Sequence, residues 1–120
     1  MALRKILVVE DRADLAETIQ RQLEHIGLTS AVATTGLAAL RKVREEKPDL
    51  LLVDLILPDI SGLDVGDRLK AEDSTRSIPI LAITDMSPGW ENCLERGFDG
   101  YLIMPFSHHE LKQEIEKFLR

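Results

Sequence analysis

The sequence Ile6-Leu-Val-Val-Glu-Asp11 is a short, continuous apolar run that ends in two acids. Similar apolar runs recur at 50–53, 80–83 and 101–103. A continuous run of this length, with no alternation of polar residues, is typical of a parallel strand that is covered on both faces. These four runs therefore predict a parallel β-sheet.

Helical spacing fills the intervals between these runs. Leu15, Ile19, Leu23 and Ile26 form one apolar stripe that ends at Gly27. Further helices are predicted over 37–43 before Pro48, from Ser61 to about Glu72, from Ser87-Pro88, and over 107–119, where Ser107 and Glu110 have capping-box spacing. The half-polar segment 28–34 resembles an edge strand. Five strand–helix units in succession predict an α/β fold, a three-layer sandwich with a five-stranded parallel sheet.

Composition and charge narrow the class of protein. The 120 residues suit one domain over 1–120, and 44% hydrophobic with 30% charged residues suits a globular fold. Fifteen Lys and Arg against 21 Asp and Glu give a net charge of −6, which argues against direct nucleic-acid binding and against a membrane surface. A single cysteine, and neither a membrane-spanning run nor a signal peptide, predict a cytoplasmic location.

Polar residues that follow the predicted strands are the candidates for chemistry, because ligands bind outside the carboxyl ends of parallel strands. Glu10 and Asp11 follow the first predicted strand, Asp54 the third, and Thr84 and Asp85 the fourth. Three carboxylates at one edge require either raised pKa values or a bound cation, and hard oxygen ligands suit Mg²⁺. The alternative is that these acids are helix caps and loop residues. This interpretation explains any one of them taken alone, but it explains three acids at the ends of strands less well.

The same residues carry a resemblance to a known family, which covers the whole chain in the right order. The motifs are Ile6-Leu-Val-Val-Glu-Asp11, Val53-Asp54 with Pro58 and Gly62, Pro79-Ile-Leu-Ala-Ile-Thr84, and Gly100-Tyr-Leu-Ile-Met-Pro-Phe106. This pattern resembles the receiver domain of response regulators in two-component signalling. The resemblance implies a flavodoxin-like sheet with strand order 2-1-3-4-5.

The resemblance also implies roles for individual residues. Asp54 would accept a phosphoryl group from the phosphohistidine of a partner kinase. The implied ligands of Mg²⁺ (or Mn²⁺) are Glu10, Asp11, Asp54 and the backbone carbonyl of Ile56. Thr84 would give its hydroxyl to a phosphoryl oxygen, and Tyr101 would be the aromatic switch residue that moves with it.

Three departures from the family pattern fall on the half of the site that senses phosphate. Met104 stands where the family has a lysine, so one positive charge near the phosphoryl oxygens is absent. Asp85 stands where the family usually has a small residue and adds an acid. The interval from Thr84 to Tyr101 is 17 positions, about two fewer than usual, which shortens the fourth loop and helix.

Several neighbouring residues leave alternatives open. Arg12 either leans over the acidic pair and partly offsets the absent lysine, or is solvated, which is the simpler expectation. Trp90 is either an exposed partner contact or a packing residue, in the early part of the shortened helix. Cys93 is expected to pack rather than react. Pro105 is a candidate cis peptide, as in the family.

These observations favour a receiver with Asp54 as a Mg²⁺-dependent phospho-acceptor and with impaired or altered switching. Enzymatic activity would be at most self-phosphorylation and self-dephosphorylation at Asp54. The alternative is a phosphorylation-independent pseudo-receiver that acts as an interaction module. A nucleotide- or flavin-binding domain is disfavoured, because Glu10 and Asp11 would repel a phosphate there. Expected partners are a histidine kinase or phosphotransfer protein and a downstream protein target, with the chain a monomer or weak homodimer.

Overall fold

In the computed structural model, residues 5–86 and 89–118 are described, and they form one parallel sheet of five strands. The strands are β1 (Lys5–Val9), β2 (Thr29–Ala33), β3 (Leu50–Asp54), β4 (Ile80–Thr84) and β5 (Gly100–Ile103). Their order across the sheet is β2-β1-β3-β4-β5, and every neighbouring pair is parallel. The predicted fold class and strand order are confirmed, with the half-polar β2 at one edge.

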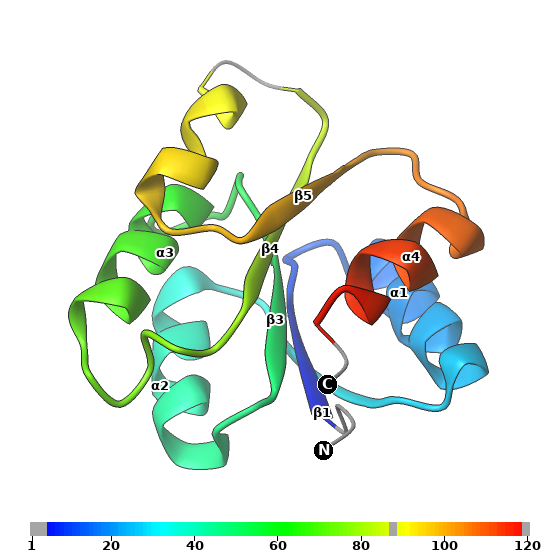
Figure 1. The fold of residues 1–120 in the computed structure, drawn as a ribbon, viewed down its shortest axis with the longest axis horizontal. Coiled ribbons are helices and arrows are strands. Elements are labelled where there is room, and N and C mark those ends of the chain that lie inside the picture. The colour runs from blue at the N-terminus through cyan, green and yellow to red at the C-terminus, as the bar shows by residue number, and fades with distance from the viewer. Residues whose placement is uncertain (1–4, 87–88, 119–120) are drawn as a thin grey trace.

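Four α-helices in the described ranges cover the two faces of this sheet. They are α1 (Ala13–Ile26), α2 (Gly36–Glu46), α3 (Gly62–Ala71) and α4 (His108–Glu116). Figure 1 shows α2 and α3 on one side of the sheet and α1 and α4 on the other. Alternate strand residues enter the two cores: Leu7 and Val9 pack towards α2 and α3, whereas Ile6 and Val8 pack towards α1 and α4. The strands β1, β3 and β4 are therefore buried on both faces, as their continuous apolar runs predict, whereas β5 exposes Tyr101 and Ile103 on one face.

Local signals in the sequence set the ends of the helices. The hydroxyls of Thr35, Ser61 and Ser107 each accept a hydrogen bond from a backbone N–H in the first turn of α2, α3 and α4. Ser107 and Glu110 complete the predicted capping box, because the Ser107 N–H donates to the Glu110 carboxylate at 2.9 Å. Helix α1 ends at Gly27, which takes the left-handed conformation with φ 90°.

The connection between β4 and β5 differs from the prediction. Instead of a shortened α-helix it contains two 3₁₀ turns, η1 (Trp90–Asn92) and η2 (Leu94–Arg96). Gly89 and Gly97, both with φ 96°, bracket these turns. A 3₁₀ turn advances further per residue than an α-helix, so a short segment can still cross the edge of the sheet. The predicted helix start at Ser87-Pro88 lies outside the described residues.

Helix α2 and Cys93 bear on two further predictions. The spacing of Leu37, Leu40 and Val43 predicts a helix, which is α2, and Leu40 and Val43 are buried whereas Leu37 is 50% exposed. Gly36, one position earlier, is buried instead and packs against the half-buried Ile60. Cys93 is 1% exposed, and burial raises the pKa of its thiol, which confirms a packing role.

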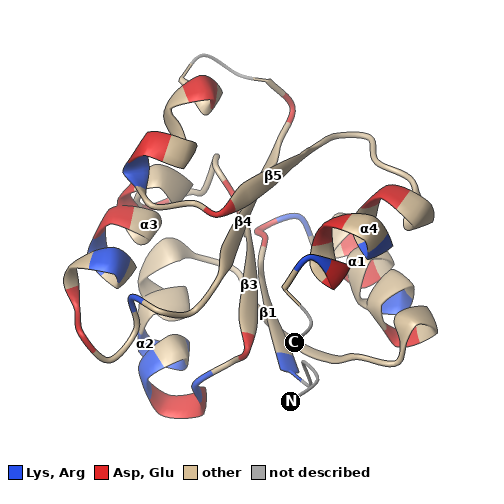
Figure 2. Ribbon diagram, in the orientation of Figure 1, with Lys and Arg blue, Asp and Glu red and all other residues tan. Residues whose placement is uncertain are grey.

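Charged side chains of both signs share the helical surfaces. Figure 2 shows Lys and Arg interspersed with Asp and Glu along α2 and α3. Arg96 illustrates the arrangement, since it joins η2 to α3 through Asp64 at 3.2 Å and Asp67 at 2.6 Å. Among the helices of residues 5–86 and 89–118, none combines the length and the apolar character needed to cross a bilayer.

Candidate functional site

Glu10, Asp11 and Asp54 converge at the carboxyl edge of the sheet. Glu10 follows β1, Asp54 is the last residue of β3, and these two strands are neighbours with Val9 paired to Val53. One carboxylate oxygen from each of the three acids lies within 4.8 Å of the others. The prediction that these side chains meet at one edge is confirmed.

The three acids differ in their contact with water. Glu10 is fully buried and Asp54 is 3% exposed, whereas Asp11 is exposed. Burial, together with the neighbouring Asp54 carboxylate, raises the pKa of Glu10 to about 7, although hydrogen bonds from Arg12 act in the opposite direction. The cluster therefore consists of two buried acids with one exposed acid beside them, and it attracts a cation.

Arg12 supplies a cation from within the chain. Its Nη2 lies 3.3 Å from Glu10 Oε1 and 3.1 Å from Asp54 Oδ2. The Arg12 backbone N–H also donates to Glu10 Oε2 at 3.1 Å. The simpler expectation, a solvated arginine, is wrong. Glu10 and Asp54 are buried, and leaving two buried carboxylates unpaired costs more free energy than removing part of the hydration of one guanidinium. Half of the Arg12 side chain nevertheless stays in contact with solvent.

A cavity of about 180 Å³ opens above the acids. Its lining residues are Asp11, Arg12, Asp54, Ile56, Asp85 and Met104. Two of the three departures from the family pattern, Asp85 and Met104, thus lie beside the predicted metal ligands. The Met104 sulfur lies 3.7 Å from Arg12 Nη2, so the guanidinium contacts the thioether as well as the two carboxylates.

The backbone after β3 fixes the orientation of Asp54. The Ile56 N–H donates to Asp54 Oδ1 at 2.8 Å, while Arg12 takes the other oxygen, Oδ2. Gly62, at the start of α3, packs so closely on the backbone of Asp54 and Leu55 that no Cβ fits there. Both oxygens of the Asp54 carboxylate are therefore held, on a backbone that packs closely against Gly62.

Thr84 ends β4 at the same edge, whereas Tyr101 lies further back on β5, paired with Ala82, and neither is among the residues given for this cavity. Thr84 is buried at the end of β4, and its hydroxyl accepts a hydrogen bond from the Met86 N–H at 3.0 Å. Met86 itself has a left-handed backbone, with φ 70°. No sequence signal marked this turn, because a methionine rarely adopts that conformation.

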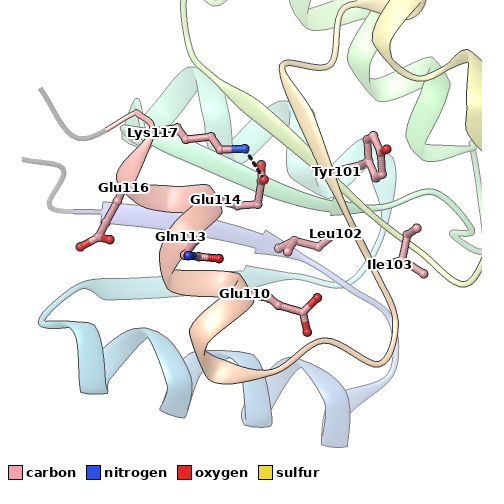
Figure 3. A pocket seen from close by; sticks show the side chains of 8 residues that line it. All are labelled: Tyr101, Leu102, Ile103, Glu110, Gln113, Glu114, Glu116 and Lys117. Atoms are coloured by element: carbon pink, nitrogen blue, oxygen red, sulfur yellow. Dashed lines mark hydrogen bonds and ion pairs between the residues drawn. The ribbon is translucent and has the colours of Figure 1, made fainter.

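Tyr101 is 37% exposed on β5. Its ring meets Trp90 edge-on, with the centroids 5.1 Å apart, so Trp90 packs rather than standing free. Tyr101 also borders a second cavity of about 540 Å³ between β5 and α4. Figure 3 shows Tyr101 and Ile103 on one side of β5 and Leu102 on the other. A shift of the Tyr101 ring would therefore change the side of β5 that carries Ile103, opposite Leu102.

The donor set decides which ligand the edge can hold. Carboxylate and carbonyl oxygens close to solvent are the ligands that Mg²⁺ prefers, and the cluster offers three carboxylates with the Ile56 backbone beside them. The Met104–Pro105 peptide is cis, as predicted, and Met104 lines the same cavity. The geometry can therefore hold one divalent cation and present Asp54 next to it.

Comparisons with known proteins agree with this geometry. Residues 6–116 match the response regulator receiver domain family. The chain is 34% identical over 119 residues to the alkaline phosphatase synthesis transcriptional regulatory protein PhoP of Bacillus subtilis, covering 98% of this chain and 49% of the relative. It is 39% identical over 117 residues to the DNA-binding response regulator MtrA of Mycolicibacterium paratuberculosis, covering 98% of this chain and 52% of the relative. The chain thus spans about half the length of these curated relatives.

Solved structures give the same result for the fold. The receiver domain of a sensor histidine kinase from Pseudomonas aeruginosa, solved with a magnesium ion in its active-site cleft, superposes with a TM-score of 0.89 at 29% identity over 98% of both chains. A putative response regulator from Chloroflexus aurantiacus gives 0.91 at 28% identity over 97% of both. The structural similarity to these two proteins therefore extends over nearly the whole chain.

Proposed function

The chain belongs to the response regulator receiver family, and on this premise we propose that it accepts a phosphoryl group on Asp54 in a Mg²⁺-dependent reaction. The observation that carries the proposal is the position of Asp54. It ends the central strand β3, is 3% exposed, and lies with Glu10 and Asp11 around one point. Two-component signalling through a phosphorylated receiver is the function that follows.

The transfer is a nucleophilic substitution at phosphorus. One Asp54 carboxylate oxygen forms a bond to the phosphorus of a partner's phosphohistidine, the P–N bond breaks, and the imidazole leaves with its electron pair and takes up a proton. Such transfers depend on positioning and on charge neutralisation more than on covalent machinery. The Ile56 N–H donates to Asp54 Oδ1 at 2.8 Å. This hydrogen bond orients the carboxylate and so defines the direction of its other oxygen, Oδ2.

Glu10, Asp11, Asp54 and the Ile56 carbonyl are the proposed metal ligands, with Mn²⁺ as an alternative to Mg²⁺. When bound, the cation supplies positive charge to the phosphoryl oxygens. The fit rests on the oxygen-only donor set and on the 4.8 Å spread of the carboxylates. Asp11 is the exposed member, so it gives the cation a route from solvent.

We propose that switching is altered relative to other family members. Thr84 would turn its hydroxyl from Met86 to a phosphoryl oxygen, and Tyr101 would follow. The uncharged Met104 and the acidic Asp85 both line the cavity where the phosphoryl group would stand. A further acid and an absent lysine leave the phosphorylated state less favoured, because the added negative charges find fewer counter-charges.

The proposed partners are a histidine kinase or phosphotransfer protein as the donor and a protein target for the output. Direct nucleic-acid contact is not part of the proposal, given the net charge of −6 and the interspersed charges of the helices. The relative MtrA is named as DNA-binding, and this chain matches about half of it. We propose a monomer or weak homodimer.

One observation favours a second candidate, a pseudo-receiver that binds partners without phosphorylation. Arg12 already neutralises Glu10 and Asp54, so the cluster is partly satisfied with no cation present. In this alternative the Arg12 contacts are permanent and the edge of the sheet is a fixed interaction surface.

Mass spectrometry after incubation with MgCl₂ and acetyl phosphate tests the two candidates. The proposed function expects the mass of one phosphoryl group on the wild type and none on Asp54→Ala. Omission of MgCl₂ should slow uptake strongly. A wild-type protein that stays unmodified under conditions that label a control receiver would favour the pseudo-receiver.

A further inference from the structure

Arg12 uses the same carboxylate oxygens that a divalent cation would need. Its Nη2 lies 3.1 Å from Asp54 Oδ2 and 3.3 Å from Glu10 Oε1, and both acids are predicted metal ligands. A guanidinium and a metal ion cannot both stand within bonding distance of one pair of oxygens without repulsion. The two cations are therefore alternatives for the same place.

The Arg12 guanidinium can move from the acidic cluster directly into solvent. The Arg12 side chain is 52% exposed, so it reaches the acids from solvent. Its outer contact is the Met104 sulfur at 3.7 Å, which is weak and carries no charge. The residue can therefore leave the cluster without breaking any packed core.

We infer that Arg12 is a tethered counter-ion of the acidic cluster, which holds Glu10 and Asp54 in the metal-free protein and competes with divalent cations for them. The inference rests on the proposed function only in assigning a divalent cation to these acids. It adds a threshold: the site fills at a higher Mg²⁺ concentration than the carboxylates alone would require.

Two consequences follow for a variant without the guanidinium. Arg12→Gln removes the competitor, so Mg²⁺ should bind more tightly, by roughly three- to tenfold for a partly exposed ion pair. The same change leaves buried Glu10 and Asp54 without a counter-charge, so the metal-free variant should be less stable than the wild type. Mg²⁺ should then raise the unfolding midpoint of Arg12→Gln more than that of the wild type, because the ligand binds only the folded state.

The experiment titrates MgCl₂ at constant ionic strength into wild type, Arg12→Gln and Arg12→Lys, by calorimetry and by thermal unfolding. Arg21→Gln is the matched control, since Arg21 is an exposed arginine on α1 paired only at the surface with Glu17 at 3.4 Å. We expect tighter binding for Arg12→Gln, no change for Arg21→Gln and an intermediate value for Arg12→Lys, which keeps a charge but loses the planar fork. Should Arg12→Gln unfold without metal, Arg12→Lys still gives the comparison.

The possible results separate this inference from the proposed function. Equal Mg²⁺ affinity in Arg12→Gln and wild type, or weaker affinity in the variant, would overturn the competition and leave phosphorylation of Asp54 untouched. Absence of Mg²⁺ binding by Arg12→Gln at millimolar metal would overturn it as well. Tighter binding by the variant upholds the inference even where acetyl phosphate fails to label Asp54, a result that removes only the proposed function.

Discussion

The ring of Trp90 meets the ring of Tyr101 edge-on, at a centroid distance of 5.1 Å and an interplanar angle of 64°. Trp90 belongs to the 3₁₀ turn η1 and Tyr101 to the edge strand β5, so the pair joins the segment after β4 to the end of the sheet. The aromatic side chain assigned as the switch residue is thus packed against the single tryptophan of the protein. Movement of one ring must change the surroundings of the other.

Trp90 fluorescence should therefore report switching without any added label. With MgCl₂ and acetyl phosphate, we expect a shift in the tryptophan emission of the wild type, because Tyr101 leaves an edge-on contact that holds one indole face. Tyr101→Leu removes the ring. This variant should show the shifted emission before phosphorylation, and its emission should change little when MgCl₂ and acetyl phosphate are added. An unchanged spectrum in a wild-type sample that mass spectrometry finds phosphorylated would contradict the coupling.

Met104→Lys should accelerate phosphoryl uptake. A unit charge at about 4 Å contributes roughly 1 to 4 kcal/mol at effective dielectrics of 80 to 20, and about 1.4 kcal/mol is a tenfold change in rate. Since Arg12 already brings one positive charge to the cavity, we expect a gain of about fivefold to tenfold rather than the upper limit. Met104→Leu keeps the size without the charge and is the control. Equal rates for the two variants at saturating MgCl₂ would show that the site does not depend on this charge.

Asp59 ties the loop after β3 to the start of α2. Its carboxylate accepts hydrogen bonds from the Leu37 N–H at 2.9 Å and the Gly36 N–H at 2.8 Å, and these bonds lower the pKa of Asp59. The folded protein therefore favours the charged form, so the stabilisation is complete above the ordinary carboxyl pKa of about 3.9 and is lost as the pH falls through the lowered value.

Urea unfolding of wild type and Asp59→Asn measures this contribution. We expect the wild type to be the more stable protein at pH 6 and the difference to shrink below pH about 4. Comparing the two proteins at each pH removes the titration of all other carboxylates. A difference that stays constant from pH 6 to pH 3 would show that the charge of Asp59 contributes nothing.

Gly62→Ala should destabilise the protein much more than Gly66→Ala, although both residues lie in α3. A Cβ at Gly62 meets the backbone of Asp54 and Leu55, which cannot move aside. A Cβ at Gly66 meets the ring of buried Phe98 first and stays 3.2 Å from the Arg96 carbonyl oxygen, so the contact that must give way is with a side chain rather than with the backbone. We expect a loss of about 1 to 3 kcal/mol or more for Gly62→Ala, as for other overpacked sites, measured by urea unfolding. Alanine is the better helix former at both positions, so neither change loses stability through helix propensity, and similar stabilities would contradict the backbone contact.

The sequence predicts the parallel sheet and the convergence of its acids because both depend on local pattern. Continuous apolar runs identify the buried strands, and residues that follow such strands meet at one edge whatever the details of packing. The pattern of apolar residues alone therefore places Glu10 and Asp54 correctly. The capping signals at Ser61 and Ser107 are equally local, and they are confirmed as well.

The remaining features depend on contacts between distant residues, which pattern does not carry. Arg12 is drawn to Asp54 over 42 positions of sequence, and the reason is the burial of both acids rather than anything in the neighbouring residues. Two 3₁₀ turns stand in place of the helix predicted between β4 and β5, because few residues are available between Gly89 and Gly97. The predicted helix rests on the start signal at Ser87-Pro88, and such a local signal does not carry the number of residues available for the crossing to β5.

The division of the site between central and peripheral parts of the sheet sets the rates at which its parts open. Glu10 follows β1 and Asp54 ends β3. Both strands are paired on either side and covered on both faces, so their amides should exchange with deuterium only when the whole domain unfolds. Residues 90–96 are held by isolated turns next to the edge strand and should exchange by local opening. Phosphorylation of Asp54 can therefore change the conformation of residues 90–96 while Glu10 and Asp54 keep their positions in the sheet.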